Sequence, residues 1–299
     1  MREVPYLLNR TKLFISVVEP FIRALFQKES HEGDKIGEIE PVDTYFPDFN
    51  FLDSSEKQYL KAHLRRWLLT VELGGGFFDQ LKKGTEILSL ASDGKFELIA
   101  KKRYPNLDFT YSNWDLRHSY PLQDGVFDGV TCLEVLEHLK DPDSDELDYI
   151  STHYLLGFFN TLSEINRILK NDGLALFTTP NTSSHNSLIS ILRGESHFFY
   201  WPHVREFAPF ELSYYFNKCG FEVLEMTSFS PYEDSARQTG FRIRLLEAVA
   251  GLFNASPMMN QLRGTTLFFL VRKIGKVDDL LMDSGFRLVT SDLIKEKCK

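Results

Sequence analysis

The stretch FDGVTCLEVLEHLKDP, residues 127–142, decides the fold. Its first half is apolar through Leu133, as is typical of a strand buried on both faces. The second half then brings Glu134, Glu137 and His138 within five residues. Either the chain leaves its core here, or the strand delivers polar groups to a ligand site. Which of the two holds depends on how the neighbouring strands end.

Strand-like and helix-like segments alternate on both sides of this stretch. This pattern predicts an α/β fold with a Rossmann-like doubly wound sheet, mostly parallel and covered by helices on both faces. The last strand follows an insertion, residues 231–263, and is expected to enter antiparallel at the sheet edge. Besides 127–135, we expect strands at residues 85–92, 107–114, 174–180, 221–230 and 265–273, and helices at 95–104, 149–170, 209–220 and, within the insertion, 241–253.

Two further helices are expected at the N-terminus. TKLFISVVEPFIRALF (11–26) and SSEKQYLKAHLRRWLLTVEL (54–73) carry apolar residues at helical spacing. Ser54 or Ser55 is the expected cap of the second helix. Gly74-Gly75-Gly76 should stop this helix rather than cradle a phosphate, since no strand precedes the glycines and no Gly-Lys-Ser/Thr follows them.

The chain is expected to have one main domain with additions. Because no long linker separates the N-terminal helices from the first strand, residues 1–80 should form a helical cap over the ligand crevice rather than an independent domain. Residues 81–276 should form the main domain, and residues 277–299 are a weakly patterned tail.

Composition narrows the class of partner. A net charge of −8 argues against nucleic acid as the main partner, because binding to nucleic acid needs a basic face. The three cysteines are widely spaced, form no metal-ligand pair and suit a reducing compartment. No leader sequence and no apolar run long enough to span a bilayer is evident, so we expect a cytoplasmic protein. The oligomeric state stays open.

Three predicted strands end in polar residues. In an open α/β sheet, ligands bind beyond the carboxyl ends of the strands. Glu134, Glu137 and His138 follow one such end, LASDG follows the first strand, and TTPN follows a later one. We therefore expect one crevice formed by all three.

Three motifs of the sequence resemble those of a known family. LQDGVFDGVTCLEVLEHLKDP, then LSEINRILKNDGLALFTTPN, then HVREFAPFELSYYFNKCGFEVLEM are ordered and spaced as in class I S-adenosylmethionine-dependent methyltransferases, in the branch of small-molecule and sugar methyltransferases. The resemblance runs from about Gly84 to Lys273. It implies S-adenosylmethionine as the cofactor and a small-molecule acceptor as the partner.

The resemblance also assigns roles to residues. It implies cofactor binding at the first strand end, where backbone amides and a helix N-terminus approach the methionine part, at a ribose-binding site after the second strand, and at the end of the central strand. Asp115 is our preferred ribose acceptor, with Asn113 beside it at the position expected by spacing. The implied cofactor-binding residues are Leu90, Ala91, Ser92, Gly94, Asn113, Asp115, Leu133 and Glu134.

Two departures from the family pattern stand out. The first turn, SLASDGKF, keeps only Gly94, and Ala91 stands where the family has its first glycine. Because alanine does not freely adopt positive φ, the turn is expected to differ. The second crossover, between Gly94 and Phe127, is short and is expected to be trimmed to a loop.

The acceptor side is expected in YWPHVREF, residues 200–207. His203 is the candidate catalytic base for a hydroxyl acceptor; otherwise it orders the loop. Arg205 and Glu206 could bind a polar substrate or pair with each other. Glu137 and His138 are expected to cap the turn after the strand. The candidate substrate-binding residues are Tyr200, Trp201, Arg205 and Glu206.

These observations favour an S-adenosylmethionine-dependent methyltransferase acting on a small polar acceptor, with a hydroxyl of a sugar or sugar-containing metabolite as the expected target. A catalytically degenerate binding or scaffold protein is the alternative, because the first turn is glycine-poor. A nicotinamide-dependent oxidoreductase fits less well, since the three-glycine fingerprint is missing. The ligand spacing indicates no metal site, although an acidic pocket could hold magnesium.

Overall fold

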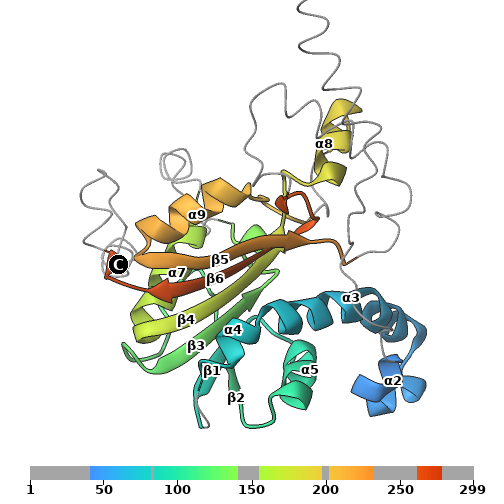
Figure 1. The fold of residues 1–299 in the computed structure, drawn as a ribbon, viewed down its shortest axis with the longest axis horizontal. Coiled ribbons are helices and arrows are strands. Elements are labelled where there is room, and N and C mark those ends of the chain that lie inside the picture. The colour runs from blue at the N-terminus through green and yellow to red at the C-terminus, as the bar shows by residue number, and fades with distance from the viewer. Residues whose placement is uncertain (1–40, 82–83, 141–154, 197–201, 232–260, 278–299) are drawn as a thin grey trace, which may run out of the picture.

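A computed structural model describes residues 41–81, 84–140, 155–196, 202–231 and 261–277. Within them the centre is one six-stranded sheet with the order β2-β1-β3-β4-β6-β5 (Figure 1). β6 is antiparallel to both of its neighbours, and the other strands run parallel to one another. The strands are β1 (Glu86–Leu90), β2 (Asp108–Tyr111), β3 (Phe127–Leu133), β4 (Leu169–Pro180), β5 (Phe221–Phe229) and β6 (Thr266–Lys273).

The predicted doubly wound α/β sheet with an antiparallel last strand is confirmed, but the expected place of that strand was wrong. β6 lies between β4 and β5, not at the edge, and pairs Phe269 with both Phe177 and Met226. The reason is burial. β6 is buried along Thr266–Val271, whereas β5 is mostly half-buried and can therefore form the edge.

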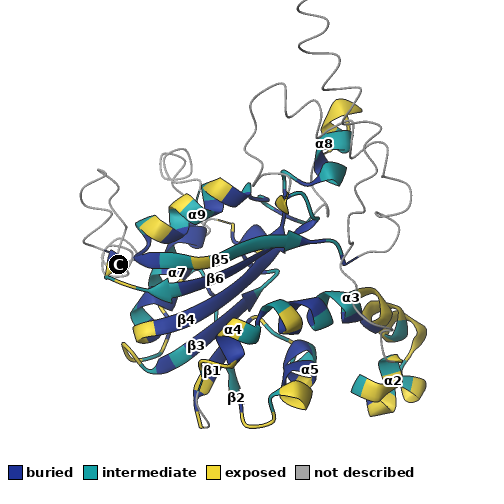
Figure 2. Cartoon of the chain, in the orientation of Figure 1, coloured by how far each residue is buried: buried dark blue, intermediate teal, exposed yellow. Residues whose placement is uncertain are grey.

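Helices cover the two faces of the sheet and form two apolar clusters. On one face α7 (Leu156–Ile168) and α9 (Pro209–Lys218) pack on alternate residues of the strands, among them Leu267 and Phe269 of β6. On the other face α3 (Ser54–Leu73), α4 (Gly75–Phe78) and α5 (Lys95–Arg103) pack on the opposite set, with Phe268 and Leu270. The central strands β3, β4 and β6 are mostly dark blue in Figure 2, which marks them as buried, whereas β5 is mostly teal.

Helix α3 has the predicted bounds, but its cap is different. The side chain of Asp53 accepts a hydrogen bond from the Glu56 amide at 2.8 Å, so Ser54 and Ser55 lie inside the helix. Gly74 is the C-cap of α3, and packing requires glycine there because a Cβ would lie 2.9 Å from the Leu176 Cδ1 atom. The triple glycine is thus a helix boundary, as expected.

The remaining differences between the predicted and the observed elements lie mainly in the segments that connect the strands. No helix occurs in residues 112–126, so the trimmed crossover is confirmed. β4 begins at Leu169, five residues earlier than expected, because Leu169 already pairs with Phe127 before the register shifts. The described elements that the sequence did not predict are α2 (Val42–Tyr45), η1 (Pro47–Phe51), α4 (Gly75–Phe78), η2 (Leu136–His138) and α8 (His185–Leu192). The helices expected at 11–26 and 241–253 lie outside the described residues.

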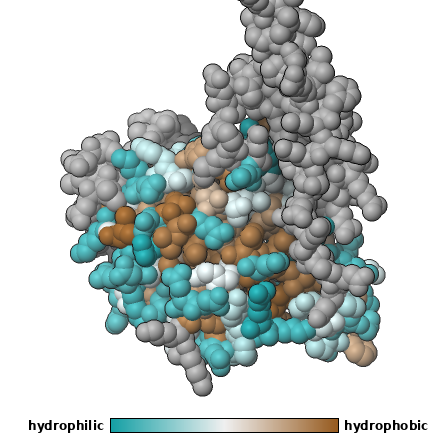
Figure 3. All heavy atoms as spheres, viewed as in Figure 1, coloured by the Kyte–Doolittle hydropathy of each residue, from teal (hydrophilic) through white to brown (hydrophobic). Residues whose placement is uncertain are grey.

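The visible surface is of mixed polarity. Figure 3 shows brown apolar areas interrupted by teal polar residues on the face seen in Figure 1. Among the described helices, none is both long and apolar enough to cross a membrane.

Trp67 of α3 tests how far this helix belongs to the core of the main domain. It is only 6% exposed and joins the cluster on its face of the sheet. We expect Trp67→Ala to lower the free energy of unfolding by about 3 to 5 kcal/mol, measured by urea denaturation. The control is Phe51→Ala, since Phe51 is 89% exposed and its loss should cost less than about 0.5 kcal/mol. An equally small effect at Trp67 would show that α3 is not held by the core.

Candidate active site

The turn after β1 and the end of β2 form one surface at the carboxyl edge of the sheet. The Ala91 amide donates a hydrogen bond to the Ser112 hydroxyl at 2.8 Å, and the Ser112 amide donates to the Ser89 carbonyl at 3.1 Å. A Cβ at Gly94 would lie 3.7 Å from the Tyr111 hydroxyl. One of the three expected polar strand ends, LASDG, thus meets the end of β2, which was not among them.

The first turn keeps a left-handed residue at its start. Ala91 has φ 49° and Gly94 has φ 83°. Alanine thus adopts here the positive φ that it does not freely take, and the expected difference from the family's turn stays a prediction. The hydrogen bond from the Ala91 amide to Ser112 helps to hold alanine in a conformation that costs about 1 to 2 kcal/mol.

The N-terminus of α5 faces the same edge. Gly94 caps this helix without a side chain, so amides of its first turn can receive an anion. The Ser92 hydroxyl donates to Glu97 Oε2 at 2.8 Å and accepts a hydrogen bond from the Gly94 amide at 3.1 Å. Lys95 pairs with Asp93 at 2.7 Å, which adds one charge of each sign to the turn.

Helix α3 passes close to this turn. The Tyr59 hydroxyl lies 3.5 Å from Asp93 Oδ2, and Arg66 pairs with Glu134 Oε2 at 3.2 Å. His63 stacks edge-on against Tyr59 between them, and burial, with Arg66 nearby, lowers the pKa of His63 to about 4. The sequence reasoning missed these three residues. Their spacing could have revealed them, because residues 59, 63 and 66 of one predicted helix lie on the same face and all carry polar groups.

Asn113 and Asp115 follow β2 and are both exposed. Arg117 Nη2 pairs with Asp115 Oδ2 at 2.7 Å, and this contact holds the pKa of Asp115 at about 2. Asp115 is therefore an ionised hydrogen-bond acceptor, but a ribose would have to share it with Arg117.

At the end of β3, Leu133 is half-buried and Glu134 turns the chain with φ 55°. The Glu134 amide donates to the Thr178 carbonyl at 2.8 Å, which ties this turn to β4. A residue other than glycine in a left-handed conformation is a strained position, and such positions concentrate at functional sites.

Glu137 lies on η2, directly after this turn, and is 1% exposed. Its Oε2 accepts a hydrogen bond from the Thr179 hydroxyl at 2.9 Å, while its Oε1 has no partner among the described residues. Burial and the nearby Glu134 raise the pKa of Glu137 well above its usual value. The expectation that Glu137 caps the turn locally was wrong, because its side chain reaches across to β4.

The segment that carries His203 is fixed to η2. The Val204 amide donates to the Glu137 carbonyl at 2.8 Å, and the Arg205 amide does so at 3.3 Å. The rings of His203 and His138 lie 4.9 Å apart, edge to face. His138 is exposed, and burial of its inner part together with His203 lowers its pKa.

His203 and Glu206 form a buried pair, with 2.6 Å between Nδ1 and Glu206 Oε1. Arg205 does not pair with Glu206; it contacts Glu211, which also accepts a hydrogen bond from the Tyr215 hydroxyl at 3.1 Å. The structure thus brings His203 and Glu206 together with the end of β3. Tyr200 and Trp201 lie outside the described residues.

An α/β sheet of this strand order has the Rossmann-like architecture, in which ligands bind beyond the carboxyl ends of the strands. A family model described as "Methyltransferase domain" matches residues 60–226, more than half of the chain. The chain belongs to this methyltransferase domain family. No curated protein matches the sequence.

Two solved structures with a similar fold are also methyltransferases. An S-adenosylmethionine-dependent methyltransferase from Archaeoglobus fulgidus is 14% identical, with 72% of this chain and 99% of that chain covered and a TM-score of 0.44. One from Thermotoga maritima, described as a possible histamine N-methyltransferase, is 17% identical, with 77% and 99% covered and a TM-score of 0.42. These likenesses say nothing about the acceptor of this chain.

The match to the family model identifies the protein as a class I methyltransferase that uses S-adenosylmethionine. The residues present suit this cofactor, which carries a carboxylate, an ammonium and a sulfonium. Arg66 and the N-terminus of α5 offer donors to a carboxylate, and the buried Glu134 Oε1 has no partner among the described residues and can accept from an ammonium.

Ala91→Gly tests the strain in the first turn. Glycine removes a left-handed cost of about 1 to 2 kcal/mol and adds unfolded-state freedom of about 0.4 to 1 kcal/mol. We expect the free energy of unfolding to rise by about 0.5 to 1 kcal/mol in urea denaturation. The matched control, Ala100→Gly inside α5, should lose stability. Loss of stability at both positions would show that Ala91 is not strained.

Proposed function

We propose that the protein transfers the methyl group of S-adenosylmethionine to a hydroxyl group of a small polar acceptor, a sugar or sugar-containing metabolite. The observation that carries the hydroxyl assignment is the buried His203–Glu206 pair beside the end of β3. A hydroxyl must lose its proton as the methyl group arrives, and an imidazole held by a carboxylate suits that task. The sugar assignment rests on the resemblance of the three sequence motifs.

The cofactor is proposed to lie along the ends of β1, β2 and β3. Its methionine part would contact the turn of Leu90, Ala91, Ser92 and Gly94, with Arg66 near the carboxylate. Asp115, with Asn113 beside it, would bind the ribose hydroxyls. Leu133 and Glu134 would line the side nearest the acceptor.

In this reaction the acceptor oxygen attacks the methyl carbon, the carbon–sulfur bond breaks, and S-adenosylhomocysteine leaves. The sulfonium is already activated, so alignment of acceptor and methyl group supplies most of the rate. His203 Nε2 receives the acceptor proton. Glu206 orients the ring through Nδ1 and stabilises the imidazolium that results.

The acceptor is proposed to bind on the segment around His203. Tyr200 and Trp201 are proposed to contact it with their rings, and Arg205 with its guanidinium. Glu206 has its main contact with His203, so its proposed part in substrate binding is to position that ring. The N-terminal helices, residues 1–80, are proposed to close the cofactor side, which the contacts of Tyr59 and Arg66 support.

Asp115→Ala tests the ribose assignment. Loss of a charge-assisted hydrogen bond should weaken S-adenosylmethionine binding by about 1.5 to 3 kcal/mol, measured by titration calorimetry. Asp124→Ala is the matched control, because Asp124 also pairs with an arginine, Arg167, at a site remote in function. Unchanged affinity in Asp115→Ala together with reduced affinity in Asn113→Ala would move the assignment to Asn113.

His203→Ala tests the acceptor side. Turnover should fall roughly a hundredfold or more while cofactor affinity stays close to that of the unchanged protein. Glu206→Gln keeps a side chain of the same size and should lower kcat with little change in KM. His185→Ala on α8 is the histidine control. Full activity in His203→Ala would show that alignment alone carries the reaction.

Transfer of a labelled methyl group from S-adenosylmethionine to a panel of sugars, nucleotide sugars and matched amines tests the function as a whole. We expect the label in a methyl ether of a sugar-containing compound. Label on an amine instead would exclude the hydroxyl assignment. Binding of S-adenosylmethionine without any transfer across the panel would favour the degenerate binding protein.

A further inference from the structure

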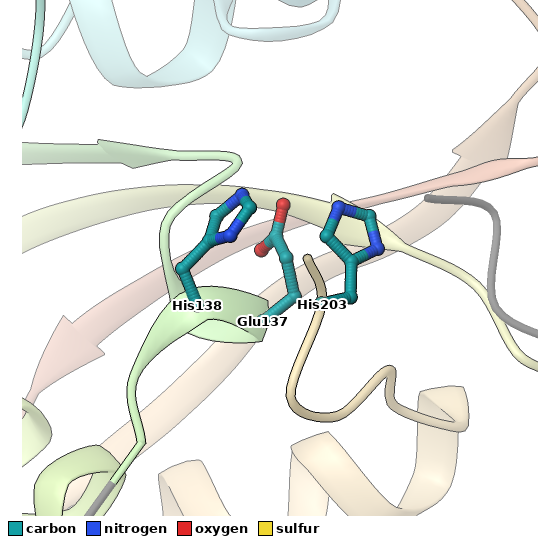
Figure 4. Close-up of side chains that lie close together, drawn as sticks. All are labelled: Glu137, His138 and His203. Atoms are coloured by element: carbon teal, nitrogen blue, oxygen red, sulfur yellow. The ribbon is translucent and has the colours of Figure 1, made fainter. Parts of the chain in front are cut away.

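Three side chains with metal-ligating atoms converge beside the end of β3. Glu137 and His138 come from η2, and His203 comes from the segment before α9. One ligand atom of each lies within 4.8 Å of the other two. Figure 4 shows the Glu137 carboxylate between the two imidazole rings. Glu137 and His138 are neighbours in the sequence, but His203 lies far along the chain from both, which explains why ligand spacing did not indicate a site.

The environment of the Glu137 carboxylate is a second, independent observation that points to a ligand here. It is 1% exposed, and its Oε1 has no partner among the described residues. A buried carboxylate without full hydrogen bonding is costly unless a cation or a donor meets it. The carboxylate lies between the two imidazoles, so a cation bound by all three groups would give it a further partner.

His203 is held in the way that metal-binding histidines usually are. Its Nδ1 contacts Glu206 Oε1 at 2.6 Å, and the other ring nitrogen, Nε2, is the proposed ligand atom. Figure 4 shows one ring nitrogen of His203 directed to Glu137 and the other turned away. Metal-ligating histidines commonly donate their second ring nitrogen to a carboxylate, which fixes the tautomer and the ring orientation.

We propose that Glu137, His138 and His203 bind one divalent transition-metal ion, with Glu206 as the orienting partner of His203. Two imidazole nitrogens and one carboxylate oxygen suit zinc, manganese, iron or cobalt, whereas magnesium and calcium prefer sites made of oxygen ligands. Ligand atoms must lie about 2.0 to 2.2 Å from such an ion. His138 is exposed, so its ring has room to close on the ion.

Three protein ligands leave at least one coordination position for an outside oxygen. Since the site lies on the proposed acceptor side, an acceptor hydroxyl can take that position. With an ion bound, His203 Nε2 would be a ligand instead of the proton acceptor proposed above, and the ion would lower the pKa of a coordinated hydroxyl, whose proton would go to water. This consequence rests on the proposed function, but ion binding itself does not.

The test is binding of Co²⁺ and Zn²⁺ to the full-length, untagged protein in the absence of S-adenosylmethionine. Co²⁺ is followed by its visible absorption and Zn²⁺ by calorimetry, with Mg²⁺ as the comparison ion. We expect one ion per chain. Glu137→Gln and His138→Ala should each weaken binding roughly a hundredfold, and Glu206→Gln by about 10- to 100-fold.

His138→Ala is the decisive variant, because its exposed side chain can be removed without opening the core. His185→Ala controls for the loss of any histidine, and thermal unfolding confirms that each variant is folded. No stoichiometric binding, or equal affinity in His138→Ala and His185→Ala, would overturn the proposal. Because no cofactor or acceptor is present, failure of ion binding is distinct from failure of the methyltransferase assignment.

Discussion

Burial of the Glu137 carboxylate is the constraint on which the acceptor side of the site depends. Its side chain reaches Thr179 of β4, and its carbonyl accepts the Val204 and Arg205 amides, so one residue joins η2, β4 and the segment of His203. The packing that excludes water from this carboxylate also fixes the neighbouring imidazoles. A buried carboxylate with an unpartnered oxygen is a costly feature, and a ligand site gives it a physical reason.

Two segments outside the sheet contribute residues to different parts of its carboxyl edge. Helix α3 contributes Tyr59 and Arg66 above the ends of β1 and β3, where charges of both signs suit a zwitterionic cofactor. The segment of His203 covers the other end, where a buried His–Glu pair suits proton transfer or ion binding. Glu134 stands between the halves in a left-handed turn. The methyl group would cross at this point.

Much of the fold was predictable, because strand and helix periods alternate clearly and α3 has the predicted bounds. The place of β6 was not, since pairing depends on which strand can tolerate an exposed edge. For the site, polar strand ends at Glu134 and the position of His203 were visible in the sequence. The side chains that these residues contact could not be predicted from the sequence. Glu137 with Thr179, and Arg66 with Glu134, are contacts that only tertiary packing creates. Left-handed Ala91 likewise depends on its bond to Ser112.

The most direct measurement of the central claim is a crystal structure of the complex with S-adenosylhomocysteine. The account predicts its carboxylate near Arg66 and the N-terminus of α5, and its sulfur at Glu134, facing the group of Glu137, His138 and His203. Such a position would let a methyl group pass from the cofactor half to the acceptor half. A sulfur atom directed away from that group, or a ligand bound elsewhere on the chain, would contradict the account.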